Sequence, residues 1–190
     1  MAAPSYKRIV ILGKSGSGKT TLARQISQQL ALPHIELDAL NWEPHWTEAP
    51  AAVFRARVAA ALSQPLWVVD GNYSRVRDLV WAQADTLLWL DYPLALTLRR
   101  LFRRTLRRLF RREVLWGNNH ERWSSYLSLK PENNLFLWSI KSHAKQRREY
   151  PLLLEQPEHR HLHVLRLHNP RETTEWLRSL TASPTSPNEG

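Results

Sequence analysis

Short runs of apolar residues alternate along the chain with longer stretches in which apolar residues recur at helical spacing. This alternation predicts an α/β fold built on a parallel sheet of five strands. The predicted strands cover residues 8–12, 32–37, 66–69, 86–90 and 163–167. Four of these runs end at a polar residue, namely Asp38, Asp70, Asp91 and Asn169. In parallel sheets ligands bind at the carboxyl ends of strands, so we expect the functional site there.

The stretches between the runs predict the helices. They cover residues 21–30, 51–63, 75–83, 94–114, 133–150 and 172–180, and Asn133 or Asn134 is the expected N-cap of the fifth. The segment that follows the fourth strand is too long for a simple crossover, and excess length at that place is typical of a lid. We therefore predict one domain over residues 1–180, with a lid insertion at about 99–150 and a disordered tail at 181–190.

A glycine-rich loop follows the first predicted strand. It reads Gly13-Lys14-Ser15-Gly16-Ser17-Gly18-Lys19-Thr20, which is the pattern G-x-x-x-x-G-K-[ST], and a helix is expected to begin near Thr21. Backbone N–H groups of such a loop point at an anion, and the helix N-terminus adds a positive dipole. Lys19 is expected to reach the β- and γ-phosphates, and Thr20 to bind Mg²⁺. The motif predicts binding of a nucleoside triphosphate by residues 13–21.

Composition narrows the class of protein. The chain has 190 residues, a net charge of +10 and no cysteine, which excludes disulfides, thiolate metal sites and a thiol nucleophile. The apolar run near the N-terminus is interrupted by the phosphate loop, so we expect neither a signal peptide nor a membrane span. A cytoplasmic protein is the resulting expectation.

Most of the positive charge lies in one predicted helix. Eight arginines occur in pairs between Arg99 and Arg112, with leucine and phenylalanine between them. One side of this helix should pack on the protein and the other should be cationic. The cationic side has three alternative interpretations: a solvated surface, a surface for nucleic acid or acidic lipid, or lid arginines that neutralise phosphate charge during transfer.

The order of these motifs resembles a known group of proteins. The phosphate loop, Asp38, the Asp70-Gly71-Asn72 turn, the Asp91-x-Pro93 turn and the arginines after it are similar to the adenylate-kinase-like family of P-loop small-molecule kinases. More narrowly, Glu36 to Trp42, Asp70 to Tyr73 and Arg112 to Asn119 resemble bacterial DNA topology modulation (FlaR-type) proteins. The resemblance covers about residues 7–180 and implies the P-loop NTPase three-layer fold with a helical, arginine-rich lid.

The resemblance also implies roles for individual residues. Asp70 would hold Mg²⁺ together with Thr20, Asp38 would orient or deprotonate the acceptor, and Arg75 would meet the acceptor. Arg100 and Arg104 match the spacing of lid arginines, and the loop at Asn169 and Pro170 would pass the adenine. Simpler alternatives stay open: Asp70 as an Asx-turn residue, Asp38 as a helix cap and Arg75 as a surface arginine. Trp42 either stacks on a planar acceptor or packs as an ordinary aromatic.

Together these observations predict a Mg²⁺-dependent transfer of the ATP γ-phosphoryl group to a small, nucleotide- or nucleoside-like acceptor. Lys19, Arg100, Arg104 and Asp38 are the expected catalytic residues. Asp38, Trp42, Asp70 and Arg75 are the expected acceptor-side residues. The alternative is a nucleic-acid-associated ATPase that binds DNA through the basic helix at 99–112. Salt dependence would separate the two, because polyanion binding weakens steeply with ionic strength.

Overall fold

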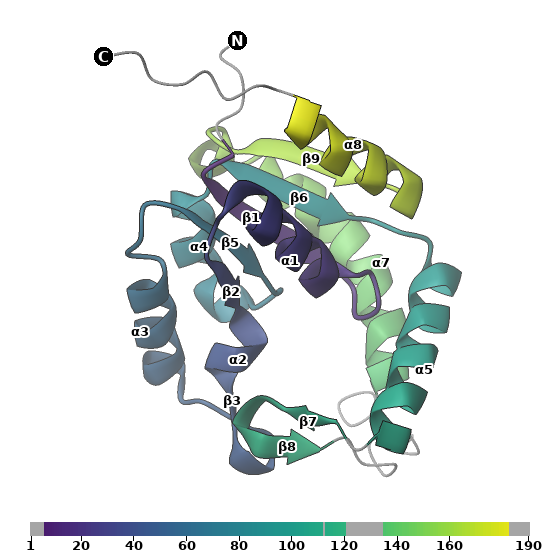
Figure 1. Cartoon of the computed structure of the whole chain (residues 1–190). Coiled ribbons are helices and arrows are strands. Elements are labelled where there is room, and N and C mark those ends of the chain that lie inside the picture. The colour runs from purple at the N-terminus through teal and green to yellow at the C-terminus, as the bar shows by residue number, and fades with distance from the viewer. Residues whose placement is uncertain (1–5, 112, 121–134, 183–190) are drawn as a thin grey trace.

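The computed structural model describes residues 6–111, 113–120 and 135–182. Its centre is a sheet of five parallel strands in the order β2-β5-β1-β6-β9 (Figure 1). The strands are β1 (Arg8–Gly13), β2 (His34–Glu36), β5 (Trp67–Asp70), β6 (Thr86–Leu90) and β9 (His163–Leu167). The predicted α/β fold with a five-stranded parallel sheet is confirmed.

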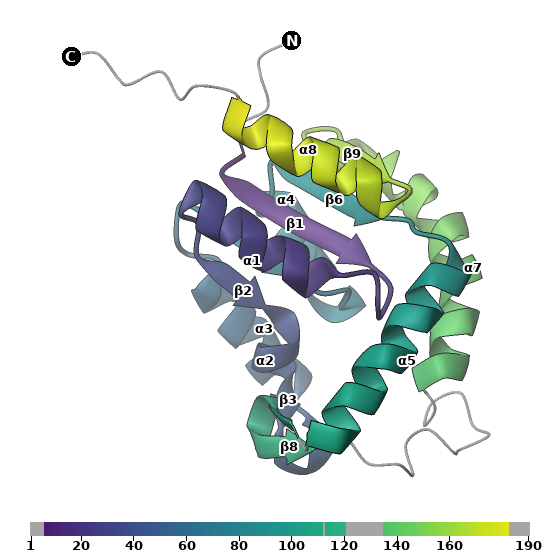
Figure 2. The same ribbon diagram turned by 45° about the vertical axis from the view of Figure 1, so that its right-hand side comes forward.

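Helices cover both faces of this sheet, which gives the expected three layers. On one face lie α1 (Lys19–Leu30) and α8 (Pro170–Ala182), which Figure 2 shows in front of the strands. On the other face lie α3 (Ala51–Ala61), α4 (Arg77–Gln83) and α7 (Leu135–Leu154). The side chains of β1 alternate accordingly: Ile9 and Ile11 are buried with α1 and α8, and Val10 and Leu12 with the opposite helices.

The register of the strands places their carboxyl ends along one edge. Glu36 pairs with Asp70, Ile11 pairs with Asp70, and Gly13 pairs with Leu90. The chain leaves this edge from β2 into the short helix α2 (Leu37–Asn41), and from β6 into the long helix α5 (Leu94–Arg111). The functional edge of the sheet is therefore flanked by α2 and α5.

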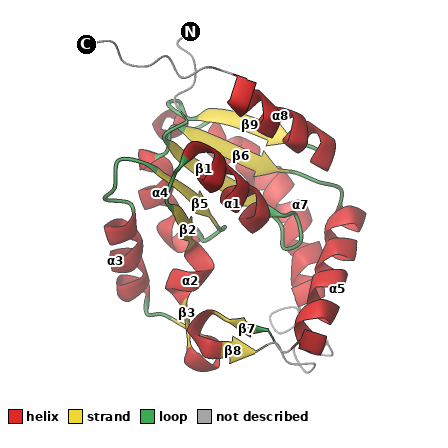
Figure 3. Ribbon diagram, viewed as in Figure 1, coloured by secondary structure: helices red, strands yellow, loops and turns green. Residues whose placement is uncertain are grey.

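Two small hairpins were not predicted from the sequence (Figure 3). The first consists of β3 (Trp42–Glu43), a 3-10 turn (Pro44–Trp46) and β4 (Thr47–Glu48). The second consists of β7 (Val114–Leu115), a 3-10 turn (Trp116–Asn118) and β8 (Asn119–His120). We call residues 42–48 the first hairpin and residues 114–120 the second hairpin.

Several predicted boundaries differ from the structure. The second strand was expected at 32–37, but Leu37 begins α2, because its side chain is buried directly against Gly71. The fourth helix ends at Arg111 and not at residue 114, and Val114 belongs to the second hairpin. The helix at Arg75 begins instead as a 3-10 turn (Ser74–Val76).

The last two helices are longer than predicted. Helix α7 continues through Pro151 to Leu154, where Leu153 and Leu154 pack against the core and stabilise this extra turn. Helix α8 extends to Ala182, two residues into the predicted tail. The remaining tail residues, the expected N-caps Asn133 and Asn134, and Arg112 lie outside the described residues.

In the described part of the chain, none of the helices is both long enough and apolar enough to cross a membrane.

Candidate active site

The phosphate loop connects β1 to α1 in a conformation that depends on its glycines. Gly16 has φ 83° and Gly18 has φ 97°, both in the left-handed region that favours glycine. The Ser17 amide donates to the Lys14 carbonyl at 3.0 Å and closes the loop. A Cβ at Gly16 would lie 2.3 Å from the Thr97 carbonyl oxygen, so α5 approaches the loop too closely for any side chain there.

The neighbouring strand end supports the first residue of the loop. The Gly13 amide donates to Asn72 Oδ1 at 3.3 Å, and Asn72 Nδ2 donates back to the Gly13 carbonyl. Asn72 belongs to the Asp70-Gly71-Asn72 turn after β5, so this turn fixes the phosphate loop as well as carrying Asp70. The sequence contains this turn as a recognisable motif but does not indicate a role for Asn72.

Two lysines of the loop lie close together in the protein. Lys19 Nζ donates to the Lys14 carbonyl at 3.1 Å, and burial lowers the pKa of Lys19. Lys14 is only 5% exposed, and its Nζ has no hydrogen-bond partner among the described residues. Burial, and then the charge of Lys19, lower the pKa of Lys14 to about 7, while Asp91 acts in the opposite direction. The loop therefore carries a second amine, whose proton is weakly held. Lys14 lies within the predicted nucleotide-binding residues 13–21, but the sequence pattern gave its side chain no separate role.

The end of β5 supplies a buried carboxylate next to the loop. Asp70 is 2% exposed, and its Oδ2 has no hydrogen-bond partner among the described residues, although His34 Nε2 lies 3.5 Å away. Such an oxygen suits a cation, and Thr20 directly follows Lys19, on which the charge of Asp70 acts, in the first turn of α1. The described residues contain no group of three or more acidic or histidine side chains that could hold a metal by themselves. The donor set fits Mg²⁺ bound partly by phosphates.

The end of β2 and the start of α2 carry two more carboxylates. Tyr73 Oη donates to Asp38 Oδ1 at 2.5 Å, and burial together with Asp38 raises the pKa of this tyrosine far above its usual range. Burial raises the pKa of Glu36, and the charges of Asp70 and Asp38 raise it further. A hydrogen bond from Trp116 of the second hairpin lowers it. Glu36, Asp38, Asp70 and Lys19 thus interact electrostatically in one site.

Two of the expected acceptor-side residues are engaged elsewhere. Arg75 donates to Asn41 Oδ1 at 2.6 Å, pairs with Glu48 at 3.0 Å and lies over the ring of Phe54. These contacts fix the base of the first hairpin. Trp42 is half-buried and packs edge-on against Trp46, with ring centroids 5.4 Å apart. The roles of Arg75 and Trp42 at an acceptor stay predictions.

The arginine pairs of α5 divide into two sets. Arg100, Arg104 and Arg108 recur every fourth residue and are half-buried beside the buried Thr97, Leu101 and Thr105, whereas Arg99, Arg103, Arg107 and Arg111 are exposed. We call Arg100, Arg104 and Arg108 the inner arginines.

The inner arginines extend from the phosphate loop toward the end of β2. Arg100 Nη1 donates to the Ser17 carbonyl at 3.2 Å, and the charge of Arg104 acts on Lys19. Arg108 lies over the ring of Trp116 at 5.9 Å and pairs with Glu113 at 3.6 Å. The structure therefore brings the predicted Arg100 and Arg104 to the site. It adds Arg108, which the same spacing of four residues would have indicated.

The two hairpins are joined by the buried side chain of Asn119. Its Oδ1 accepts from the Trp46 amide at 2.9 Å, and its Nδ2 donates to the carbonyls of Glu43 and Trp116 at 2.8 and 2.7 Å. Trp46 Nε1 donates in turn to the His120 carbonyl at 3.0 Å. A Cβ at Gly117 would lie 2.6 Å from the Glu43 carbonyl carbon. We call this junction the hairpin clasp; it links the segment after α2 to the segment after α5.

The loop after β9 begins α8. Asn169 is bonded to Glu172 in both directions: the Glu172 amide donates to Asn169 Oδ1 at 3.0 Å, and Asn169 Nδ2 donates to Glu172 Oε1 at 2.6 Å. This is a helix cap, followed by Pro170 at the first helical position. Asn169 and Pro170 therefore have a structural role, and their expected contact with adenine stays a prediction.

Asp91 directly follows β6 and bonds to two other elements, α7 and β9. Arg147 Nε from α7 donates to it at 2.6 Å, and Arg166 Nη2 from β9 at 2.7 Å. The Asp91 amide donates to the Leu167 carbonyl at 2.9 Å. Asp91 is 5% exposed and also acts on Lys14, so it joins α7 and β9 to the edge that carries the phosphate loop.

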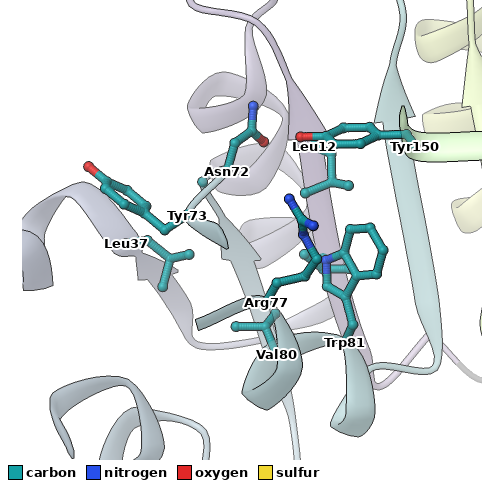
Figure 4. A pocket seen from close by; sticks show the side chains of 10 residues that line it. Leu12, Leu37, Asn72, Tyr73, Arg77, Val80, Trp81 and Tyr150 are labelled. Atoms are coloured by element: carbon teal, nitrogen blue, oxygen red, sulfur yellow. The ribbon is translucent and has the colours of Figure 1, made fainter. Parts of the chain in front are cut away.

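A small cavity lies behind the Asn72 turn (Figure 4). Arg77 lies there over the rings of Trp81 and Tyr150, at 5.2 and 5.9 Å. The cavity has a volume of about 10 Å³, enough for about one water molecule and too small for a substrate. A larger groove of about 370 Å³ lies between the turns of the two hairpins and is lined by residues 44–46 and 117–120.

Solved structures with kinase activity share this fold. A shikimate kinase from Acinetobacter baumannii in complex with shikimate has 17% sequence identity and a TM-score of 0.52, over 94% of this chain and 92% of its own. A shikimate kinase from Bacteroides thetaiotaomicron has 17% identity and a TM-score of 0.53, over 93% and 97%. The sequence matches no protein-family model, and no curated protein is similar enough to it to match. The likeness to these structures establishes the P-loop kinase fold.

Proposed function

We propose that the protein transfers the γ-phosphoryl group of ATP to a small-molecule acceptor. The sequence motifs predict that this acceptor is nucleotide- or nucleoside-like. The observation that supports this most is the convergence of three kinds of group at one sheet edge: the phosphate loop, the carboxylates Asp38 and Asp70, and the inner arginines. A protein that uses ATP only as a switch needs the phosphate loop. Transfer to an acceptor also needs a base on the acceptor side that faces cations of the lid. The two solved structures named above are kinases.

The nucleotide end of the site follows from the loop. Residues 13–21 would surround the phosphates, Lys14 and Lys19 would balance their charge, and the loop at Asn169 and Pro170 would pass the adenine. Thr20 and Asp70 would hold Mg²⁺, which would supply positive charge against the charge that develops on the phosphates.

The acceptor end follows from Asp38. In the transfer, a bond forms between the acceptor oxygen and the γ-phosphorus as the bond to the bridging oxygen of ADP breaks. Asp38 would accept the proton released by the acceptor hydroxyl, and Tyr73 orients this carboxylate through its hydrogen bond. Arg100 and Arg104 would stabilise negative charge on the transferred group from the lid side.

The narrower resemblance to adenylate-kinase-like and FlaR-type proteins stays a prediction. So does the alternative of an ATPase that binds nucleic acid, which would use the exposed arginines Arg99, Arg103, Arg107 and Arg111. No contact among the described residues favours nucleic-acid binding over phosphoryl transfer.

The test is product formation from Mg²⁺-ATP with a panel of nucleoside monophosphates, nucleosides, sugars and other hydroxylated metabolites, with duplex DNA as a separate arm. We expect a phosphorylated small molecule, and we expect Lys19→Ala to lower turnover by at least about 100-fold with an unchanged circular dichroism spectrum. Full turnover in Lys19→Ala would refute the assignment. ATP hydrolysis that appears only with DNA, and is lost at high salt, would establish the alternative.

A further inference from the structure

The acceptor end of the site is acidic. Glu36 and Asp70 are register partners at the ends of neighbouring strands, and Asp38 follows two residues after Glu36. Each of the three carboxylates acts on Lys19. Once Mg²⁺ and ATP occupy Asp70 and Lys19, Glu36 and Asp38 are the charged groups left at the end of β2.

Most described cations near this end have other partners, and Arg24 of α1, whose charge also acts on Glu36, is exposed. Arg75 is bonded to Asn41 and paired with Glu48, as described above, and Arg57 pairs with Glu43 at 2.7 Å. Arg108 pairs with Glu113. Arg100 reaches the phosphate loop, and Arg104 acts on Lys19 at the same place. Among the described residues, a phosphate group on the acceptor would therefore meet two carboxylates and, apart from the exposed Arg24, no cation dedicated to it. Like charges at such a site are strongly unfavourable.

The same carboxylates are suited to hydroxyl groups. An ionised carboxylate only accepts hydrogen bonds, so Glu36 and Asp38 each need a donor from the acceptor or the protein. Tyr73 satisfies one oxygen of Asp38, and Trp116 donates to Glu36 from the second hairpin. The two carboxylates keep accepting capacity beyond these bonds.

We infer that the acceptor is a polyhydroxylated compound without a phosphate group, which presents one hydroxyl to Asp38 for transfer and a second to Glu36 for binding. The inference rests on the proposed function and narrows it: it excludes nucleoside monophosphates and retains nucleosides and sugars, which share this chemistry. Trp116, held against Glu36 by the hairpin clasp, is a positioning residue for this carboxylate.

The test compares each hydroxylated compound with its own phosphate ester as an acceptor. We expect kcat/KM for the parent compound to exceed that for the ester by at least about 100-fold. Nucleosides and sugars form separate arms that identify the source of the hydroxyl groups. An ester used as well as its parent would overturn the inference while leaving the proposed function intact.

The variant Glu36→Gln examines the binding carboxylate, with Glu175→Gln as the control, because Glu175 pairs with Arg171 on α8. We expect Glu36→Gln to raise KM for the acceptor about 10-fold and to change the Kd for Mg²⁺-ATP by less than about twofold. We also expect it to reduce the ratio of kcat/KM for the parent compound to kcat/KM for its phosphate ester. Trp116→Phe should shift the same KM in the same direction, since it removes the bond to Glu36. Unchanged acceptor KM and preference in Glu36→Gln would overturn the inference. ATP binding without product in any arm would overturn the proposed function and the inference with it.

Discussion

Lys14 differs from Lys19 in how it responds to pH. Burial and the charge of Lys19 lower its pKa to about 7, so at pH 8 most molecules without nucleotide carry a neutral Lys14. Phosphate charge beside it would restore the ammonium form. We expect ATP binding at pH 8 to take up close to one proton, and the uptake to vanish below about pH 6, where Lys14 is already charged.

Calorimetry in two buffers with different heats of ionisation measures this uptake. Lys14→Gln should abolish it, and binding heats that do not depend on the buffer in the unmodified protein would contradict the prediction.

The effect of Lys14 on the pH dependence of stability is opposite in sign to that of a lysine whose pKa is raised by an ion pair. Between about pH 7 and 10 the unfolded chain binds more protons at Lys14 than the folded one, so this group makes stability without nucleotide rise with pH.

The division of α5 into two arginine sets gives the prediction for that element. Arg104 acts on Lys19, whereas its neighbour Arg103 is exposed on the same helix. We expect Arg104→Ala to lower kcat by about 100-fold, and Arg103→Ala to leave it within about twofold. Steady-state kinetics with saturating ATP measure both variants. Equal losses would mean that the helix contributes only through its overall charge.

The hairpin clasp predicts a second effect at this scale. Asn119→Ala removes three partly buried hydrogen bonds and should weaken the clasp by about 2 kcal/mol. We expect a higher acceptor KM and more ATP hydrolysis without acceptor, because water enters a site that is no longer closed. His120→Ala is the control, since His120 contributes its backbone carbonyl. An unchanged ratio of hydrolysis to transfer in Asn119→Ala would contradict this role.

The predictability of each element follows from where its stability originates. Strands β6 and β9 were located at their observed bounds. Leu87 to Leu90 form a continuous apolar run that Asp91 ends, and the apolar residues of β9 are followed within two positions by Asn169. The hairpins escaped prediction because each is held by the other: Asn119 and Trp46 are about 70 positions apart in sequence. Pro44 and Gly117 were the available turn signals, but they do not indicate pairing.

The site was predictable to the extent that one helix or one loop contains it. The phosphate loop is a local motif, and Arg100 and Arg104 share a helical face, so the sequence could indicate both. The roles of these residues stay predictions. Lys14 occupies a variable position of the motif, and its pKa depends on its burial and on the charges of Lys19 and Asp91, which the motif does not reveal. The engagement of Arg75 with Asn41 and Glu48 likewise depends on the first hairpin.

At the scale of the whole molecule, Asp91 joins α7 and β9 to the edge of the sheet. Asp91→Asn would leave Arg147 and Arg166 without their carboxylate, and we expect the free energy of unfolding to fall by about 2 kcal/mol, a discounted value because both arginines are partly exposed. Asp78→Asn is the matched control, because its pair with Arg55 is exposed to solvent and should contribute little to stability. Urea unfolding measures both, and equal losses would show that Asp91 has no special role.

The hairpin clasp also has a consequence for the reaction cycle. Its two halves come from segments on opposite sides of the acceptor end, one after α2 and one after α5. A phosphorylated product that departed between these segments would do so only after Asn119 releases Trp46 and Glu43. In that case the lifetime of the closed clasp would set an upper limit on the number of turnovers per second, whatever the speed of the chemical step.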